Sequence, residues 1–514
     1  PASSTLFVDS MLARTPALEA DRDAAFRRTV ERLDTLGKMD FTVPASLKAT
    51  MRGYQVDGYQ WLGSLEHLGL GGILADDMGL GKTLQMIAHI LARVETGDTK
   101  PTLVVCPASL VYNWTAELER FAPSLDACAV VGAKAQRRVQ IAGAAEHNVV
   151  VTSYDLMRRD IDEYAEQDFA RVVLDEAQYI KNPLTQVARA AKRLPAGVRF
   201  ALTGTPIENR LSELWSIFDF LMPGLLGTRE SFAKRFESPV EHAEGDSAAR
   251  LQALVSPFVL RRVKEDVVAD LPEKIEDTVM AQLTGEQRKL YLANQDRIAQ
   301  QVQHREASEF KKDKLKVLAE LTKLRQICCD PRLHYEDYKA GSAKLDTCME
   351  LVHGALDGGH RILLFSQFTG MLDIIGKRLA KEDIAFLKLT GASSKEGRAK
   401  MVAQFQAGEV PVFLISLKAG GVGLNLTAAD VVIHYDPWWN VAAQDQATDR
   451  AHRIGQQHTV TVYKLIAKDT IEERIMQMQE SKRDLVNSVL GGDGISSALF
   501  TREDVLALLG GDGR

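Results

Sequence analysis

Long apolar runs, paired cysteines and an excess of positive charge are all missing from this 514-residue sequence. No apolar stretch approaches the roughly 20 residues that a membrane-spanning helix needs, so we expect no membrane partner. The five cysteines form no CxxC pair and no zinc-finger spacing beside histidines, which favours reduced cysteines in an intracellular protein. The net charge of −6 argues against a wholly basic nucleic-acid surface, although it is compatible with a local basic groove.

The chain is too long for one hydrophobic core, and its pattern changes along its length. It begins with Pro1 rather than Met, so we expect a segment of a longer protein. We predict five parts, which are a helical N-terminal leader (1–44), a first α/β lobe (45–225), a helical region (226–340), a second α/β lobe (341–490) and a short tail (491–514).

Short β-branched apolar runs that end in polar or small residues recur in two series. Continuous apolar strands separated by helical stretches predict parallel sheets that are covered on both faces. We therefore predict an α/β fold with two doubly wound parallel-sheet lobes and a helical insertion between them. Ligands are expected at the carboxyl ends of the strands. The runs occupy residues 102–107, 148–155, 171–178 and 199–206, then 361–368, 385–391, 410–417, 431–437 and 459–467.

The stretch ADDMGLGKTLQ, residues 75–85, has the character of a phosphate-binding loop. Gly79 and Gly81 would let backbone amides approach phosphate oxygens at the start of a helix. Lys82 can reach the β and γ phosphates, and the Thr83 hydroxyl can hold Mg²⁺. Asp76 stands where the usual pattern has its first glycine. Taken alone, the motif predicts a nucleoside triphosphatase of unspecified kind.

Two further groups of residues complete the predicted chemistry. Asp175 and Glu176 end an apolar strand, where Asp175 suits the Mg²⁺ shell and Glu176 can orient or deprotonate an attacking water. Gln446, Arg450 and Arg453 fall at i, i+4 and i+7 of a predicted helix, a face that suits arginine fingers on a transferring phosphoryl group. Plain surface charge is the commoner reason for such a stripe. Fingers from the second lobe would tie hydrolysis to lobe closure.

Five motifs occur in a fixed order, namely DDMGLGKT, DEAQ, LTGTPIEN, SLKAGGVGLNLTAAD and DQATDRAHRIGQ. With RGYQVDGYQWL, TLVVCPASLVYNW, PFVLRRVKEDV and LRQICCDP, they resemble the SWI/SNF-type (sucrose non-fermenting) DNA-translocating ATPases of helicase superfamily two. The resemblance covers nearly the whole chain and implies two RecA-like lobes. It implies paired helical protrusions with Arg261 and Arg262 at their base, and a brace at 462–475.

The resemblance also implies roles at the ATP site. Gln55 would contact adenine and select ATP, and Leu80 completes the loop glycines. Gly423 and Gln446 would lie near the γ-phosphate. Gln178 stands where relatives often carry His, and would link the site to a coupling motif. That motif is Thr203, Gly204 and Thr205.

The same resemblance implies contacts with the DNA backbone from both lobes. In the first lobe these are Asn113, Trp114, Ser153 and Tyr154, and in the second lobe they are Ser366, Gln367, Ser416 and Lys418. Such a groove grips phosphates without reading bases, so binding would be independent of sequence and sensitive to salt.

We therefore expect a monomeric ATP- and Mg²⁺-dependent translocase on double-stranded DNA that remodels or displaces a DNA-bound protein. A strand-separating helicase and an ATP-gated DNA-binding scaffold with little turnover remain alternatives, although a scaffold has no need of a general base or fingers. A metabolic P-loop kinase would explain nothing after residue 210. The ending SSALFTREDVLALLG resembles bacterial members, so we expect a cytoplasmic, nucleoid-associated protein, or a nuclear one if the source is eukaryotic.

Overall fold

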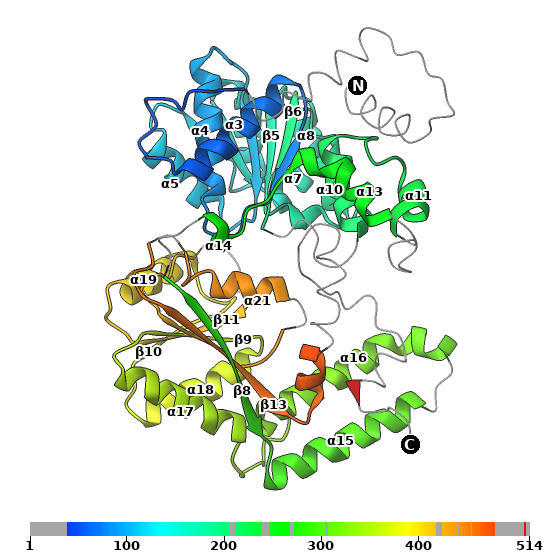
Figure 1. Cartoon of the computed structure of the whole chain (residues 1–514), viewed down its shortest axis with the longest axis vertical. Helices are drawn as coiled ribbons and strands as arrows, with labels where there is room; N and C mark the ends of the chain where they lie inside the picture. Colours follow the sequence, from blue (N-terminus) through cyan, green and yellow to red (C-terminus); the bar gives the residue numbers. More distant parts are fainter. Residues whose placement is uncertain are drawn as a thin grey trace. The chain divides into compact units, whose positions relative to one another are not determined.

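The computed structural model describes residues 39–204, 211–237, 247–267, 272–303, 307–417, 424–438, 441–453, 455–477 and 508–509. The described residues up to 267 form one compact unit, and those from 272 onwards form a second (Figure 1). Each unit is built around its own parallel sheet, which confirms the predicted α/β fold with two parallel-sheet lobes. None of the described helices is long and apolar enough to cross a membrane.

The sheet of the first unit has the strand order β3-β4-β2-β5-β6-β1-β7, and each neighbouring pair is parallel. The apolar pattern predicted four of these strands. It missed β1, β3 and β7, which hold only two or three residues each. The strands are β1 (Gly72–Leu74), β2 (Thr102–Cys106), β3 (Ala127–Ala129), β4 (Val149–Ser153), β5 (Arg171–Asp175), β6 (Val198–Leu202) and β7 (Val259–Leu260).

Most helices of the first unit connect successive strands of its sheet. The α-helices are α3 (Gly53–His67), α4 (Lys82–Glu95), α5 (Val111–Phe121), α6 (Lys134–Ala142), α7 (Tyr154–Arg159), α8 (Ile161–Ala165), α9 (Gln186–Arg193), α10 (Leu211–Leu221), α11 (Arg229–Phe232), α13 (Ser247–Val255) and α14 (Lys264–Val267). Shorter turns of other helical types lie at η1 (Ala144–Glu146), η2 (Ala177–Ile180), η3 (Ala233–Glu237) and η4 (Ser256–Phe258).

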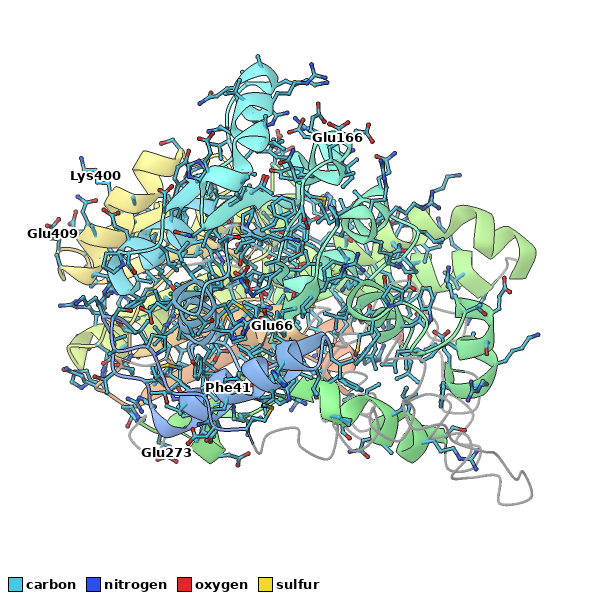
Figure 2. The ribbon with its side chains drawn as sticks, turned by 90° about the horizontal axis from the view of Figure 1, so that it is seen from above. Phe41, Glu66, Glu166, Glu273, Lys400 and Glu409 are labelled. Atoms are coloured by element: carbon cyan, nitrogen blue, oxygen red, sulfur yellow. The ribbon has the colours of Figure 1, made fainter. Side chains whose placement is uncertain are left out.

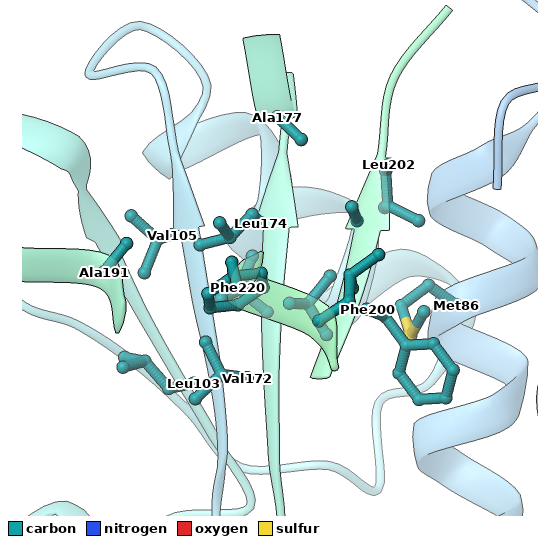
Figure 3. Close-up of a cluster of buried hydrophobic side chains, with 14 of the residues drawn as sticks. Met86, Leu103, Val105, Val172, Leu174, Ala177, Ala191, Phe200, Leu202 and Phe220 are labelled. Atoms are coloured by element: carbon teal, nitrogen blue, oxygen red, sulfur yellow. The ribbon is translucent and has the colours of Figure 1, made fainter. Parts of the chain in front are cut away.

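Every residue of β2, β4 and β5 is buried. Because successive side chains of a strand point to opposite faces, this burial requires helices on both faces of the sheet. Figure 3 shows part of the resulting core, to which β2, β5 and β6 contribute together with Met86 of α4, Ala191 of α9 and Phe220 of α10. This apolar core holds the carboxyl ends of the strands in fixed positions.

A buried polar cluster lies at the opposite, amino ends of β2 and β5. Arg171 Nε donates to both carboxylate oxygens of Glu66 (3.0 and 2.8 Å), and Glu66 lies in the last turn of α3 (Figure 2). His89 Nε2 of α4 lies 2.5 Å from the same carboxylate. Burial alone would raise the pKa of Glu66, but His89 and Arg171 lower it to about 2. The cluster therefore ties α3 and α4 to the sheet.

The sheet of the second unit has the order β10-β11-β9-β12-β13-β8, again with parallel neighbours throughout. Its strands are β8 (Lys274–Gln282), β9 (Ile362–Ser366), β10 (Phe386–Leu389), β11 (Val412–Ser416), β12 (Val431–His434) and β13 (Val460–Lys468). The sequence pattern predicted a helical region over 226–340 and did not reveal β7 or β8 within it. Exposed polar residues in the edge strand β8 conceal its strand character.

Two long helices, α15 (Gly285–Gln303) and α16 (Ala307–Cys329), precede the helices that pack on this sheet. Those helices are α17 (Ala343–Asp357), α18 (Thr369–Lys381), α19 (Lys395–Gln406) and α21 (Val441–Thr448), and η5 (Pro331–Leu333) follows α16. Alternate residues of β9 enter different cores. Ile362 and Leu364 pack in one core with α17 and α18, whereas Leu363 and Phe365 pack in the other with Phe405 of α19.

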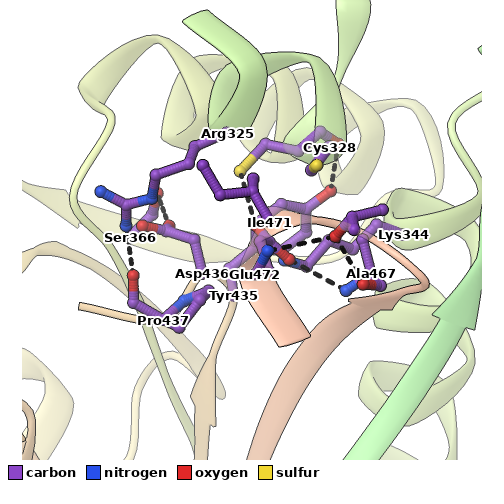
Figure 4. Close-up of polar contacts among 12 residues, drawn as sticks. Arg325, Cys328, Lys344, Ser366, Tyr435, Asp436, Pro437, Ala467, Ile471 and Glu472 are labelled. Carbon is purple, nitrogen blue, oxygen red and sulfur yellow. Dashed lines mark hydrogen bonds and ion pairs between the residues drawn. The ribbon is translucent and has the colours of Figure 1, made fainter. Parts of the chain in front are cut away.

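A fully buried ion pair lies where α17 meets the end of β13 (Figure 4). Lys344 Nζ donates to Glu472 Oε2 (2.5 Å), and the backbone N–H of Ala467 donates to the same oxygen (2.9 Å). The Lys344 ammonium also lies over the ring of Tyr435, 5.4 Å from its centroid. Since neither charge reaches solvent, each depends on the other for compensation.

We predict that Lys344→Met destabilises the second unit by about 3–5 kcal/mol, because Glu472 is then left buried without its counter-charge. The double variant Lys344→Met/Glu472→Leu should recover most of this loss, since an apolar pair of similar volume can replace a buried ion pair. The shift of the chemical denaturation transition of the second unit measures both effects. A double variant as unstable as the single one would contradict this account.

Candidate nucleotide-binding site

The loop between β1 and α4 has the backbone that a phosphate cradle requires. Gly79 and Gly81 adopt positive φ angles of 92° and 81°, which side chains other than glycine rarely tolerate. A Cβ added to Gly81 would come within 2.5 Å of Gln55 Nε2. The carbonyl of Leu80, between the two glycines, accepts hydrogen bonds from Tyr54 Oη (3.1 Å) and Gln55 Nε2 (3.0 Å). The predicted adenine-contacting residue therefore also supports the loop.

Lys82 begins α4 and is held against the start of the same loop. Its Nζ donates to the carbonyl oxygens of Asp76 (2.5 Å) and Asp77 (3.3 Å). A Cβ added to Gly204, just beyond β6, would lie 3.9 Å from this Nζ. The predicted coupling motif thus begins beside the phosphate loop, and Thr83 follows Lys82 at the start of the helix.

Asp175 ends β5 and is almost entirely buried. Its Oδ2 accepts a 2.8 Å hydrogen bond from the indole N–H of Trp114, and its Oδ1 accepts one from the backbone of Glu176 (3.0 Å). Burial and the neighbouring Glu176 carboxylate raise the pKa of Asp175 to about 7, against the opposing effects of Trp114 and Lys82. A cation bound nearby would offset this effect, because it favours the charged form of the carboxylate.

The oxygen groups of Asp175 and Thr83 suit Mg²⁺, which prefers oxygen ligands and usually shares them with nucleotide phosphates. Within the described parts of the chain, no group of three or more His, Cys, Asp and Glu side chains could hold a metal ion by itself. Asp175 and Thr83 would be protein ligands of a Mg²⁺ ion bound with a nucleotide.

Glu176 adopts a left-handed backbone conformation (φ 54°, ψ 56°) that is strained for a residue with a side chain. Gln178 bridges this residue to β6, because its Nε2 donates to Glu176 Oε2 (2.7 Å) while its Oε1 accepts from Thr203 Oγ1 (2.9 Å). Glutamine at position 178 thus makes a continuous link between the predicted general base and the predicted coupling motif.

The two aromatic side chains among the predicted DNA-contacting residues of the first unit are buried within it, and their contact with DNA stays a prediction. Trp114 is buried with its indole on Asp175, and Tyr154 is buried with its hydroxyl donating to the Asp175 carbonyl (2.9 Å). Tyr154 also stacks on Tyr179 at 4.8 Å between ring centroids. Ser153 caps α7 by accepting from the N–H of Leu156, whereas Asn113 is exposed on α5.

In the second unit, Ser366 and Ser416 are register partners at the carboxyl ends of β9 and β11, and both are buried. Ser366 Oγ donates to Asp436 Oδ1 (2.5 Å; Figure 4), and the side-chain amide of Gln367 donates to Oδ2 of the same carboxylate. Asp436 is fully buried and was not singled out by the sequence. It holds two predicted DNA-contacting side chains in one place.

The predicted helical stripe through Gln446, Arg450 and Arg453 is wrong. α21 ends at Thr448, so only Gln446 lies on the helix. The chain then tightens into turns, with Arg450 N–H donating to the Ala447 carbonyl rather than continuing the α-helical pattern. Arg450 is buried and Arg453 is partly exposed. The predicted residues Thr205, Lys418 and Gly423 lie outside the described residues.

A family model described as "SNF2-related domain" matches residues 54–333, and one described as "Helicase conserved C-terminal domain" matches residues 343–455. The chain is 40% identical over 512 residues to "Putative ATP-dependent helicase/translocase YwqA" of Bacillus subtilis, covering 96% of this chain and 55% of that protein. It is 35% identical over 543 residues to "TATA-binding protein-associated factor 172" of Homo sapiens, covering 91% of this chain and 29% of that protein.

A solved structure, "Sulfolobus solfataricus SWI2/SNF2 ATPase core in complex with dsDNA", aligns at 38% identity and a TM-score of 0.47, covering 88% of this chain and 95% of that one. The chain spans about half the length, or less, of the curated relatives it matches.

We predict that Trp114→Phe lowers kcat for Mg²⁺-dependent ATP hydrolysis by about tenfold or more, because a buried carboxylate loses a hydrogen bond that is worth roughly 1.5–3 kcal/mol. Steady-state kinetics measure the effect, with Tyr112→Phe on the exposed face of the same helix as the control. Affinity for duplex DNA without nucleotide should change little. A variant that loses DNA affinity and keeps kcat would instead support the DNA contact predicted from the sequence.

Proposed function

The chain belongs to the SNF2-related family, and we propose that it is a Mg²⁺-dependent ATPase that moves along double-stranded DNA. The proposed ATP hydrolysis rests above all on the link from Glu176 through Gln178 to Thr203, beside the phosphate loop. A protein that only binds ATP has no need to hold a general base in a strained conformation. The link therefore favours hydrolysis over an ATP-gated scaffold.

In this proposal, each site residue of the first unit has a distinct role in ATP hydrolysis. The amides around Gly79 and Gly81 bind the phosphates, and Lys82 exchanges its two backbone acceptors for phosphate oxygens. Bound Mg²⁺ would neutralise charge on the β and γ phosphates, with Thr83 and Asp175 as its protein ligands. Glu176 orients the water that attacks the γ-phosphate, and Gln178 holds the Glu176 carboxylate in place.

The second unit supplies the groups that make hydrolysis depend on motion. Arg450 and Arg453 stabilise the charge that develops on the transferring phosphoryl group, and Gln446 and Gly423 accompany them near the γ-phosphate. Because these residues belong to the second unit, hydrolysis in this proposal requires residues of both units, and the family resemblance implies that the units close on ATP. Each cycle of closure and opening then advances the protein along the duplex.

DNA contacts in this proposal come from exposed or strand-end polar groups that grip the backbone without reading bases. Asn113 is next to Trp114 near the start of α5, and the Trp114 indole donates to Asp175. A DNA phosphate bound by Asn113 would therefore be connected to Asp175 through these two residues. In the second unit, Asp436 holds Ser366 and Gln367 at a strand end, with Ser416 beside them and Lys418 two residues further on.

As it moves along the duplex, the protein is proposed to remodel or displace another protein that is bound to the DNA. The name of the human relative associates it with a TATA-binding protein, which is itself bound to DNA, and the Bacillus subtilis relative is named as a helicase or translocase. Those relatives extend well beyond the region matched here, so target choice is assigned to the rest of the full-length proteins. Strand separation is the competing function.

Steady-state ATP hydrolysis, measured with duplex DNA, single-stranded DNA or RNA, tests the proposal. Duplex DNA should stimulate turnover most, and the stimulation should fall steeply with rising salt because phosphate contacts release counterions. Lys82→Ala should abolish turnover under every condition and serves as the background. Displacement of a third strand from triplex DNA, without release of single strands from a forked duplex, would separate translocation from unwinding. Equal stimulation by single strands or RNA would contradict the proposal.

We predict that Arg450→Ala leaves the affinity for Mg²⁺-ATP within a few fold of wild type while lowering kcat by at least about a hundredfold, because a finger acts mainly on the transition state. Equilibrium ATP binding and single-turnover hydrolysis measure the two effects. Since Arg450 is buried, thermal unfolding must be recorded in parallel. Wild-type turnover in a folded Arg450→Ala variant would show that the second unit does not complete the site.

A further inference from the structure

Asp76, the residue that departs from the usual glycine of the phosphate loop, has a carboxylate that is fully buried. Arg262, which follows β7, binds it in a bidentate manner, with Nε donating to Oδ1 (2.8 Å) and Nη2 donating to Oδ2 (2.5 Å). Gln85 of α4 donates to the same Oδ2 (3.1 Å). Aspartate therefore replaces the usual glycine at position 76 and forms an ion pair with Arg262, which lies 186 residues further along the chain.

The same guanidinium reaches the other end of the loop. Its Nη1 donates to the carbonyl of Tyr54, and the group lies over the Tyr54 ring, 5.3 Å from the centroid. Tyr54 in turn donates to the Leu80 carbonyl, between the two loop glycines. Arg262 thus contacts the start of the phosphate loop directly and its glycine turn through one intervening side chain.

Backbone hydrogen bonds add a third connection. β1 and β7 pair in parallel at Ile73↔Val259 and Leu74↔Leu260. The pairing continues beyond both strands, because the N–H of Ala75 donates to the Leu260 carbonyl (2.7 Å) and that of Asp77 donates to the Arg262 carbonyl (3.0 Å). Residues 259–262 therefore run alongside the chain as it enters the phosphate loop.

We infer that Arg262 is a positioning residue for the phosphate loop, acting through Asp76 and Tyr54 to set the loop for nucleotide binding. The inference rests on the proposed ATPase function. Lys82 donates to the Asp76 carbonyl, so the residue whose side chain Arg262 binds also holds the phosphate-binding lysine. Loss of Arg262 leaves a buried carboxylate without its counter-charge, and the loop start must shift to relieve it.

A purely structural ion pair is the competing explanation, and the same unit offers a matched control. Arg137 and Asp160 form a second buried bidentate pair, with Nε donating to Oδ2 (2.5 Å) and Nη2 donating to Oδ1 (2.8 Å). Arg137 belongs to α6, and Asp160 follows α7. Arg137→Gln therefore removes the same kind of contact without touching Asp76, Tyr54 or Lys82.

The experiment measures the Kd for the fluorescent nucleotide mant-ADP with Mg²⁺, the KM for ATP with saturating duplex DNA, and thermal unfolding, all on the whole chain. Arg262→Gln should raise the Kd and the KM by about tenfold or more, as expected for a lost charge-assisted bidentate contact. Arg262→Lys, which keeps the charge but not the fork, should fall between. Arg137→Gln should lower the unfolding temperature and leave the Kd within about twofold of wild type.

A double-mutant cycle then tests whether Arg262 acts through Asp76. Asp76→Asn combined with Arg262→Gln should bind mant-ADP no more weakly than the worse single variant, because both changes break one contact. Independent, multiplying effects would overturn the inference, as would an equal loss of affinity in Arg262→Gln and Arg137→Gln.

Folding failures and failure of the underlying ATPase proposal have distinct readouts. Should Arg262→Gln not fold, Arg262→Lys decides the matter, and an unchanged Kd and KM in that variant overturns the inference. A folded wild-type chain that binds no mant-ADP overturns both the inference and the ATPase proposal. Wild-type binding with unaltered Arg262 variants overturns the inference alone.

Discussion

A carboxylate buried at the end of an apolar strand must be given hydrogen-bond donors or a counter-charge, and the first unit is arranged around two such groups. Asp175 obtains the Trp114 indole and the Glu176 backbone, and Asp76 obtains Arg262 and Gln85. Each set of donors comes from different elements of the fold. The elements that surround the nucleotide site are therefore held to it by the cost of leaving a buried charge uncompensated.

The second unit applies the same rule to different residues. Asp436 is buried and accepts from Ser366 and Gln367, and Glu472 is buried and accepts from Lys344 and the Ala467 backbone. Figure 4 shows both carboxylates near Arg325 and Cys328 of α16, each with its own hydrogen-bond partners. In each unit, a buried carboxylate orients side chains that are predicted to contact a ligand. Asp175 orients Trp114, and Asp436 orients Ser366 and Gln367.

The sequence was informative where the relevant residues are contiguous. The apolar runs predicted the central strands. The phosphate loop and Asp175-Glu176 could be proposed as a nucleotide site from the sequence, because each motif lies within a few residues. The partners of those residues were not predictable in this way. Trp114 meets Asp175 across 61 residues and Arg262 meets Asp76 across 186, so only the folded sheet brings them together.

Two further differences have local causes. The stripe through Arg450 and Arg453 assumed that a helix would continue past Thr448, but the turn there bonds to nearer carbonyls. Strands β1 and β7 are too short to show a period, and β8 is an exposed edge. The resemblance assigns Trp114 to DNA contact because its motif matches one that contacts DNA. In the fold its indole donates to Asp175, and no residue near Trp114 in the sequence indicates this contact.

The distance along the chain between Asp76 and Arg262 bears on how the first unit can be isolated as a fragment. A recombinant piece ending near residue 225 would contain the whole phosphate loop and the Asp175-Glu176 pair, yet it would lack β7 and Arg262. The edge of β1 that pairs with β7 would lose its partner strand, and the Asp76 carboxylate would lose its ion pair with Arg262. The smallest autonomous nucleotide-binding fragment therefore has to extend past Lys264, whose N–H donates to Asp77.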